Sequence, residues 1–167
     1  MRIPIVDEQD ELIEYKDIDE RKNGEICRVS ALWVTNEKGE VLLAKRAKVK
    51  KREPGLWGPA VAGTVEEGET YESNIIKEAA EEIGLINFIP KEDQKMRRST
   101  SHEYFCQWYS SEINSEYTFT RREDEVDEIR WFAKEEILKL FQENPSMFVP
   151  SFVLTINHFI KGNDNAN

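Results

Sequence analysis

Cysteine and histidine are scarce in this chain of 167 residues, which contains two of each. Cys27 and Cys106 are too few and too far apart for a disulfide framework or a paired-cysteine metal site, so both are expected to be ordinary core thiols. His102 and His158 do not stand at the spacing of metal ligands. A histidine-rich metal centre is therefore unavailable.

Positive charge is also in short supply. The 23 lysines and arginines face 33 aspartates and glutamates, and the formal net charge is -10. This balance argues against a nucleic-acid polymer or an anionic membrane surface as the main partner. The sequence has no apolar run of about 18 residues and no basic segment followed by an apolar one. We therefore expect neither a membrane span nor a signal peptide, and a cytoplasmic location.

The composition is otherwise that of an ordinary globular protein, with 39% hydrophobic and 34% charged residues. The length allows one sizeable core but leaves little room for two. We expect a single domain over residues 1–161, with a hairpin-like extension at 1–24. The polar tail 162–167 is expected to fray.

The stretch from Gly63 to Leu85 is the most informative part of the chain and reads GTVEEGETYESNIIKEAAEEIGL. Gly68 indicates a tight turn, and Thr70 is a suitable N-cap residue. Gly84 stands where a helix ends in a left-handed residue. Together these signals predict a helix over residues 71–83.

Helical spacing assigns two faces to that helix. At about 100° per residue, an apolar stripe is expected to dock while three glutamates face outward together. The stripe consists of Ile75, Ile76, Ala79, Ala80 and Ile83, and the glutamates are Glu78, Glu81 and Glu82. Like charges at this spacing repel, and a divalent cation would relieve the repulsion. Mg²⁺ or Mn²⁺ suits such oxygen ligands and shares its shell with substrate phosphates, although an acidic cluster taken alone is also typical of a solvated surface.

The whole stretch resembles the Nudix box, whose pattern is G-x5-E-x7-R-E-U-x-E-E-x-G-U with U an aliphatic residue. The matching positions are Gly63, Glu69, Glu78, Ala79, Glu81, Glu82, Gly84 and Leu85. Lys77 is the one departure, because the family has arginine there as a structural partner of the first glutamate. The resemblance therefore implies a contact between Lys77 and Glu69 that lacks the two-pronged geometry of arginine. Gly63 and Gly84 are likewise expected to be structural.

The resemblance implies a Mg²⁺-dependent hydrolase that cleaves the diphosphate linkage of a nucleoside diphosphate derivative or a related small molecule. Glu78 and Glu82 would bind the metal, and Glu81 would be a further ligand or would orient water. The backbone carbonyl of Ala62 would complete the shell. The resemblance also allows a homodimer.

A region before the box is similar to the branch of this family related to isopentenyl-diphosphate isomerase. The similarity covers Val34–Ala47, Lys50 and Pro54–Trp57. In that alignment Ala62 stands where the isomerases have their catalytic cysteine, and Cys27 and Thr64 replace two metal-binding histidines. Alanine has no transferable proton, so the sequence favours hydrolysis over isomerisation. An isomerase-like enzyme and a non-catalytic diphosphate sensor are the alternatives.

Four residues of the isomerase site are kept. Arg46 and Lys50 match cations that contact the diphosphate, although ordinary surface cations are the alternative for both. Glu123 and Glu125 match two glutamates of that site. We expect Glu125 to be a further ligand or the general base, in an acidic run that could instead be a solvated loop.

The rest of the sequence predicts a mixed sheet with helices on both faces, which resembles the α/β/α sandwich of the Nudix fold. The predicted strands are Ile3–Val6 and Glu11–Tyr15 in an N-terminal hairpin, then Ile26–Thr35, Glu40–Arg46, Leu85–Ile89, His102–Ile113 and Val126–Phe132. The further predicted helices are Lys134–Asn144 and Ser151–Ile160.

Overall fold

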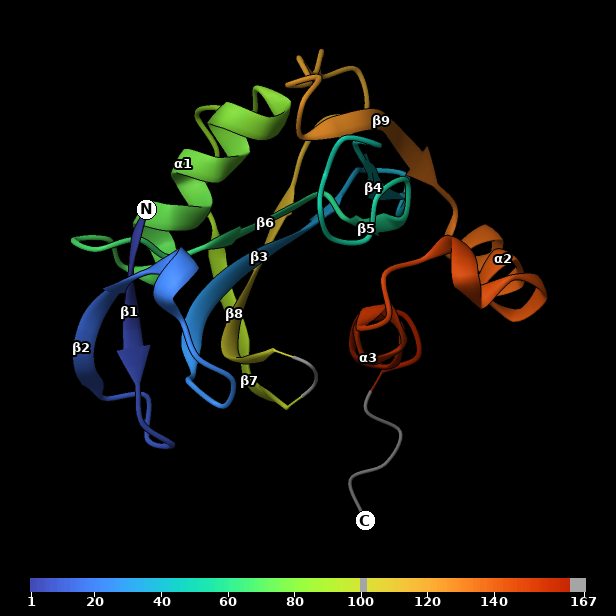
Figure 1. The fold of residues 1–167 in the computed structure, drawn as a ribbon. Coiled ribbons are helices and arrows are strands. Elements are labelled where there is room, and N and C mark those ends of the chain that lie inside the picture. The colour runs from blue at the N-terminus through green and yellow to red at the C-terminus, as the bar shows by residue number, and fades with distance from the viewer. Residues whose placement is uncertain (100–101, 163–167) are drawn as a thin grey trace.

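A mixed β-sheet organises the chain in the computed structural model, which describes residues 1–99 and 102–162 (Figure 1). Its strands are β3 (Cys27–Thr35), β4 (Val41–Arg46), β5 (Trp57–Pro59), β6 (Val61–Thr64), β7 (Lys91–Ser99), β8 (Glu103–Glu112) and β9 (Val126–Phe132). The main path runs β5-β4-β3-β8-β7, with β6 added to β3 and β9 added to β4. β3 and β8 are parallel, whereas the other pairs are antiparallel. The predicted mixed sheet is confirmed.

Helices cover both faces of this sheet, as Figure 1 shows. They are α1 (Tyr71–Ile83), α2 (Lys134–Glu143) and α3 (Phe152–Phe159), with short 3-10 helices at Ile18–Glu20 and Pro145–Met147. Alternate residues of β3 supply the two cores, because successive side chains of a strand point to opposite faces. Leu32 and Val34 pack in the core that contains α1. Ala31 and Trp33 pack in the core that contains α2 and α3, so the predicted α/β/α sandwich is also confirmed.

The N-terminal hairpin lies beside the end of β3. Its strands, β1 (Arg2–Val6) and β2 (Leu12–Asp17), form a separate two-stranded antiparallel sheet. Val6 forms a bridge to Ile26 just before β3, and Ile3 and Ile5 pack against Cys27. The predicted hairpin is confirmed, and Cys27 is the buried thiol that the sequence led us to expect.

Helix α1 begins and ends where its sequence signals place it. The Thr70 hydroxyl accepts a hydrogen bond from the backbone N–H of Ser73 at 3.0 Å, and the Ser73 hydroxyl accepts one from the N–H of Thr70 at 2.9 Å. Gly84 ends the helix with a φ of +66°, a left-handed conformation that favours glycine. These caps fix α1 at residues 71–83.

The predicted strand Leu85–Ile89 is wrong. This segment is irregular in the structure, with Leu85 buried beneath α1 and with Ile86 and Ile89 exposed. The sheet instead takes its edge strand β7 from the next segment, KEDQKMRRS. Its mostly charged residues give no strand signal, because an edge strand with one solvated face needs few apolar side chains.

The remaining predictions agree closely with the structure, and besides β7 two short strands were missed. β3, β4, β8, β9, α2 and α3 each begin and end within one residue of their predicted bounds. The missed strands, β5 and β6, are short and contain glycine or proline, which weakens any sequence pattern. No helix among the described residues is long and apolar enough to cross a membrane. Residues 163–167 of the predicted tail lie outside the described part of the chain.

Candidate active site

Helix α1 touches strand β6 at Gly63. A Cβ atom built on Gly63 would lie 2.4 Å from Cγ and 2.5 Å from Cδ of Glu78. Real side-chain atoms do not approach so closely, so glycine is needed for the Glu78 side chain to lie against this strand. Gly63 is itself paired with Ser30 of the central strand β3. The backbone of the sheet therefore fixes how close this glutamate of α1 comes to it.

Glu78, Glu81 and Glu82 do not face outward together, so that expectation was wrong. At about 100° per residue, Glu82 lies within about 20° of the buried Ile75, and Glu78 within about 60°. Both glutamates therefore belong to the docked side of the helix, whereas Glu81 is exposed. Two residues of the predicted apolar stripe are exposed instead, namely Ile76 and Ala80. The spacing of the apolar residues predicted the wrong docked face, because the docked side of α1 also contains two carboxylates.

The surroundings of Glu82 disfavour the ionised form of its carboxyl group. Burial raises the pKa of Glu82 to about 8, and the nearby charges of Glu78 and Glu125 act in the same direction. Lys50 and Arg46 act in the opposite direction without cancelling the shift. Burial also raises the pKa of Glu78. Both carboxyl groups therefore resist ionisation. A cation bound beside them would stabilise their charged forms.

Glu125 reaches the same place from the loop before β9. Its backbone carbonyl accepts a hydrogen bond at 2.9 Å from the N–H of Ala47, just after β4. Its carboxylate pairs with the ammonium group of Lys50. Glu123, which like Glu125 matches a glutamate of the isomerase site, instead has a side chain that is 86% exposed.

Lys77 makes the contact that the sequence predicts, because its ammonium nitrogen lies 2.6 Å from the carboxylate of Glu69. It also lies 2.7 Å from Glu66, a partner that the family pattern did not indicate. Although burial opposes the shift, hydrogen bonds from Lys77, the N–H of Glu66 and Asn74 hold the pKa of Glu69 below its usual value. Asn74 is fully buried and accepts a hydrogen bond from Ser30 at 2.5 Å. This network anchors the turn before α1 to β3.

A cavity of about 320 Å³ lies beside these residues. Four of the predicted site residues line it, namely Arg46, Ala62, Glu82 and Glu125. Glu78 joins the site through its contact with Gly63, and Lys50 through its ion pair with Glu125. Three arginines that the sequence analysis did not single out also line the cavity, namely Arg21, Arg52 and Arg98. They stand outside any motif, so only the fold reveals that they share one cavity.

The donor set fits a hard divalent cation, although it is not a closed cage. Within residues 1–99 and 102–162, no three or more side chains of His, Cys, Asp or Glu are arranged as a metal cluster. As the side chains stand, Glu125 is paired with Lys50, and Lys77 lies 3.7 Å from Glu78. Mg²⁺ commonly takes only one or two carboxylates and fills its shell with water and substrate phosphates. The half-buried pair Glu78 and Glu82 can supply that number.

The NUDIX domain family model matches residues 27–152, which confirms the resemblance seen in the sequence. An isopentenyl-diphosphate Delta-isomerase of Citrobacter koseri is 29% identical over 129 residues, which are 73% of this chain and 70% of that protein. An uncharacterized Nudix hydrolase of Listeria monocytogenes is 28% identical over 131 residues, which are 78% of this chain and 76% of that protein. The similar proteins therefore include both an isomerase and a Nudix hydrolase, the two activities compared from the sequence.

Solved structures show the same fold. A Deinococcus radiodurans protein superposes with a TM-score of 0.82 at 20% identity, covering 96% of this chain and 99% of that one. A MutT protein from Methanosarcina mazei superposes with a TM-score of 0.69 at 19% identity, covering 83% of this chain and 96% of that one. At such identities these similarities support the fold alone.

Gly63→Ala should destabilise the protein by about 1–3 kcal/mol, the usual range for overpacking, because the new methyl group must displace Glu78. Gly58→Ala is the matched control, since a Cβ there would meet the methyl groups of Val149 at an ordinary 3.6 Å. Thermal and urea unfolding would measure both variants. Equal stability of the two would contradict the close contact described here.

The metal-free protein should lose stability as pH rises through the range set by Glu82. The folded chain holds the Glu82 proton more tightly than the unfolded chain, because its pKa is raised from 4.5 to about 8. This favourable contribution is complete below pH 4.5 and is lost as pH rises toward 8. Melting temperatures in EDTA should therefore fall more steeply for wild type than for Glu82→Gln between about pH 5 and pH 8.5. Parallel curves for the two proteins would argue against the perturbed carboxyl group.

Proposed function

The chain belongs to the Nudix family, and we propose that it uses a divalent metal ion to hydrolyse the diphosphate linkage of a nucleoside diphosphate derivative or a related small molecule. The family and the hydrolase relative make it a Nudix pyrophosphohydrolase. The observation that carries the proposal is the burial of Glu82 beside Glu78 and Glu125 on the wall of a cavity that also contains Arg46. Such a wall combines ligands for a hard cation with a cation for phosphate.

Glu78 and Glu82 would hold Mg²⁺ or Mn²⁺, with Glu81 as a further ligand or as the group that orients water. The carbonyl of Ala62, on the cavity wall, would complete the protein ligands. When bound, the ion would supply a Lewis acid that neutralises charge on a bridging phosphate oxygen. This assignment fits the two raised pKa values, since a bound cation would favour the charged form of both carboxylates.

Arg46 and Lys50 would hold the phosphates and orient the diphosphate. Arg46 is already positioned, because its Nε donates a hydrogen bond to the carbonyl of Arg52 at 3.1 Å. Lys50 pairs with Glu125, so a phosphate that draws Lys50 away would free the Glu125 carboxylate. We assign Glu125 as the general base on this ground, because it lines the cavity and a freed carboxylate can accept a proton from water.

The organisation of the molecule belongs to the same proposal. We propose that residues 1–161 act as one catalytic domain, because the hairpin β1–β2 packs against the start of β3. The substrate would be a small molecule, and neither a nucleic-acid polymer nor a membrane surface is proposed as a partner of this acidic chain. Assembly as a homodimer remains an expectation from the family.

Replacing Glu82 with glutamine should lower kcat/KM at least about 100-fold, because the change removes a metal ligand. The assay would follow the cleaved products by chromatography for a panel of nucleoside diphosphates, nucleotide sugars and prenyl diphosphates with Mg²⁺. Excess EDTA should abolish activity of the wild type. Glu72→Gln, an exposed change in the first turn of the same helix, should leave activity intact. An active Glu82→Gln protein, or full wild-type activity in EDTA, would overturn the proposal.

Isomerase activity should be absent. Moving a double bond requires an acid and a base positioned at carbon, and Ala62 has no group that can transfer a proton. Isopentenyl diphosphate supplied with Mg²⁺ should therefore yield no dimethylallyl diphosphate, either with wild type or with Ala62→Cys. Product formation by wild type would replace the hydrolase proposal with the isomerase alternative. Activity of the variant alone would show that one thiol is enough to restore isomerase chemistry.

A further inference from the structure

Arg98 is a buried cation that forms no ion pair within residues 1–99 and 102–162. It lies near the end of the edge strand β7, and only 8% of its surface is exposed. Its guanidinium donates to the sulfur of Met96, a weak acceptor, and no carboxylate among the described residues forms an ion pair with it. Burying an unpaired charge is costly unless something else satisfies it. Arg98 also lines the cavity, so an occupant of the cavity can do so.

The register of the sheet shows which way Arg98 faces. Arg98 is paired with Tyr104 across β7 and β8, so the two side chains share one face of the sheet. Cys106 and Trp108 follow on that face at intervals of two residues, and all four line the cavity. Arg98 opposes the burial that raises the pKa of the Cys106 thiol to about 12, which places the guanidinium near that thiol.

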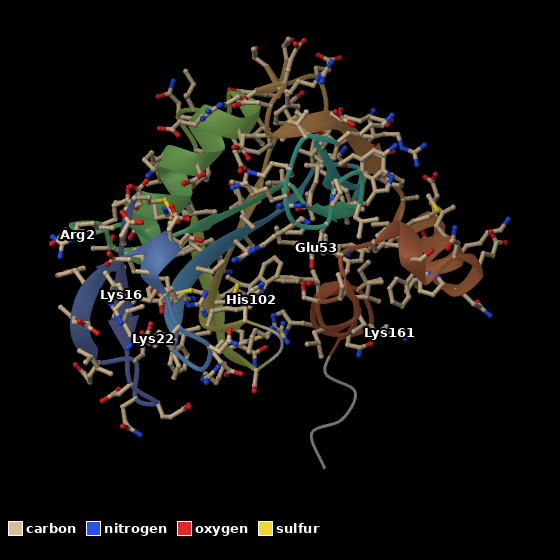
Figure 2. All side chains as sticks on the ribbon, in the orientation of Figure 1. Arg2, Lys16, Lys22, Glu53, His102 and Lys161 are labelled. Carbon is tan, nitrogen blue, oxygen red and sulfur yellow. The ribbon has the colours of Figure 1, made fainter. Side chains whose placement is uncertain are left out.

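Two more arginines line the same cavity. Arg21 and Arg52 both act on the thiol of Cys27 and on the imidazole of His102. Arg21 donates to the backbone carbonyls of Glu25 and Glu103, so its charge also has no carboxylate partner among the described residues. Figure 2 labels His102 and Glu53, which line the cavity together with Thr155 of α3. Among the charged residues that act on His102, Glu53 is the carboxylate, and it also lines the cavity.

These cations differ from those beside the carboxylates. Glu82 is influenced by Lys50 and Arg46, whereas Cys106 is influenced by Arg98. Apolar wall lies along the same cavity, from Val29, Ala31, Ala44 and Trp108. The indole N–H of Trp108 is buried without a hydrogen-bond partner among the described residues, which leaves an unused donor on this wall.

We propose that Arg98, with Arg21 and Arg52, forms a second anion subsite that holds a carboxylate or phosphate on the organic group attached to the diphosphate. This inference rests on the proposed function, and it narrows the substrate to diphosphates with a second anionic group. The apolar wall would accept the part of the molecule between the two charges. Discrimination would follow, because a neutral organic group would leave the Arg98 charge buried and unpaired.

The first experiment measures binding of inorganic phosphate to metal-free protein by calorimetry and by thermal shift. Arg98→Met should bind phosphate at least about tenfold more weakly than wild type, the usual effect of losing a charge-assisted hydrogen bond. Without phosphate it should be as stable as wild type or more stable, because it removes an unpaired buried charge. A purely structural arginine would give the opposite result for stability.

Arg97→Gln is the matched control. Arg97 is the neighbouring residue on the opposite face of β7, where it pairs with Glu8 and Glu103, so phosphate binding should survive its replacement. Arg98→Lys should retain part of the binding, since it keeps the charge without the planar fork. Unchanged phosphate affinity in Arg98→Met, or an equal loss in Arg97→Gln, would overturn the subsite.

The second experiment compares hydrolysis of matched pairs of diphosphates with Mg²⁺. The pairs are adenosine 5′-diphosphate against its 3′-phosphorylated form, and an alkyl diphosphate against its ω-carboxylate. Wild type should prefer one or both anionic members by at least about tenfold in kcat/KM, and Arg98→Met should lose that preference. Equal rates within both pairs would overturn the inference. If wild type hydrolysed none of these compounds and none of the panel used to test the proposed function, the hydrolase function would fail, and phosphate binding alone would then decide the subsite.

Discussion

The contact between Gly63 and Glu78 is the constraint on which the whole site depends. With no side chain between strand and helix, α1 lies close enough to β6 for Glu82, one turn further on, to reach the cavity. Glu125 arrives by a separate route, through the pairing of β9 with β4 and the hydrogen bond from Ala47 to its carbonyl. Backbone contacts therefore bring the carboxylates together, and they do so against the repulsion between the carboxylates themselves.

Helix α1 can hold two buried carboxyl groups because other parts of the helix stabilise its docking. Ile75 is fully buried against the sheet, and each such side chain contributes about 1.5–3 kcal/mol. Asn74 links the helix to Ser30 of β3 and to Glu69 of the preceding turn. Lys77 then neutralises Glu69. Glu69 and Glu82 lie on one short segment, and only Glu69 has a lysine partner there. A carboxyl group placed where its charge is disfavoured is expected at a site where local stability is given up for function.

The sequence was informative where a physical requirement leaves a local mark. Caps at Thr70 and Gly84 fixed the ends of α1, and the family pattern identified Lys77 as the partner of Glu69. The sequence was misleading for the orientation of Glu82, because a helical face predicted from apolar spacing is assumed to contain no carboxylates. It gave no sign of Arg98, since a charged edge strand looks like a loop and the relevant neighbours are distant in the chain. The fold is needed to show which single charges, distant in the chain, lie close together.

Charge in the cavity differs in sign from charge over the whole molecule. The chain carries a formal charge of -10, yet the cavity is lined by four arginines and three glutamates, namely Arg21, Arg46, Arg52, Arg98, Glu53, Glu82 and Glu125. Distant surface charges are screened over about 8–10 Å, so these local cations govern an anion inside. Below its raised pKa, Glu82 keeps its proton and leaves that positive potential intact. Ionising Glu82 alone would weaken the potential, whereas a divalent cation in place of the proton would strengthen it. Metal and diphosphate would then each favour binding of the other, and by linkage the coupling must be equal in both directions.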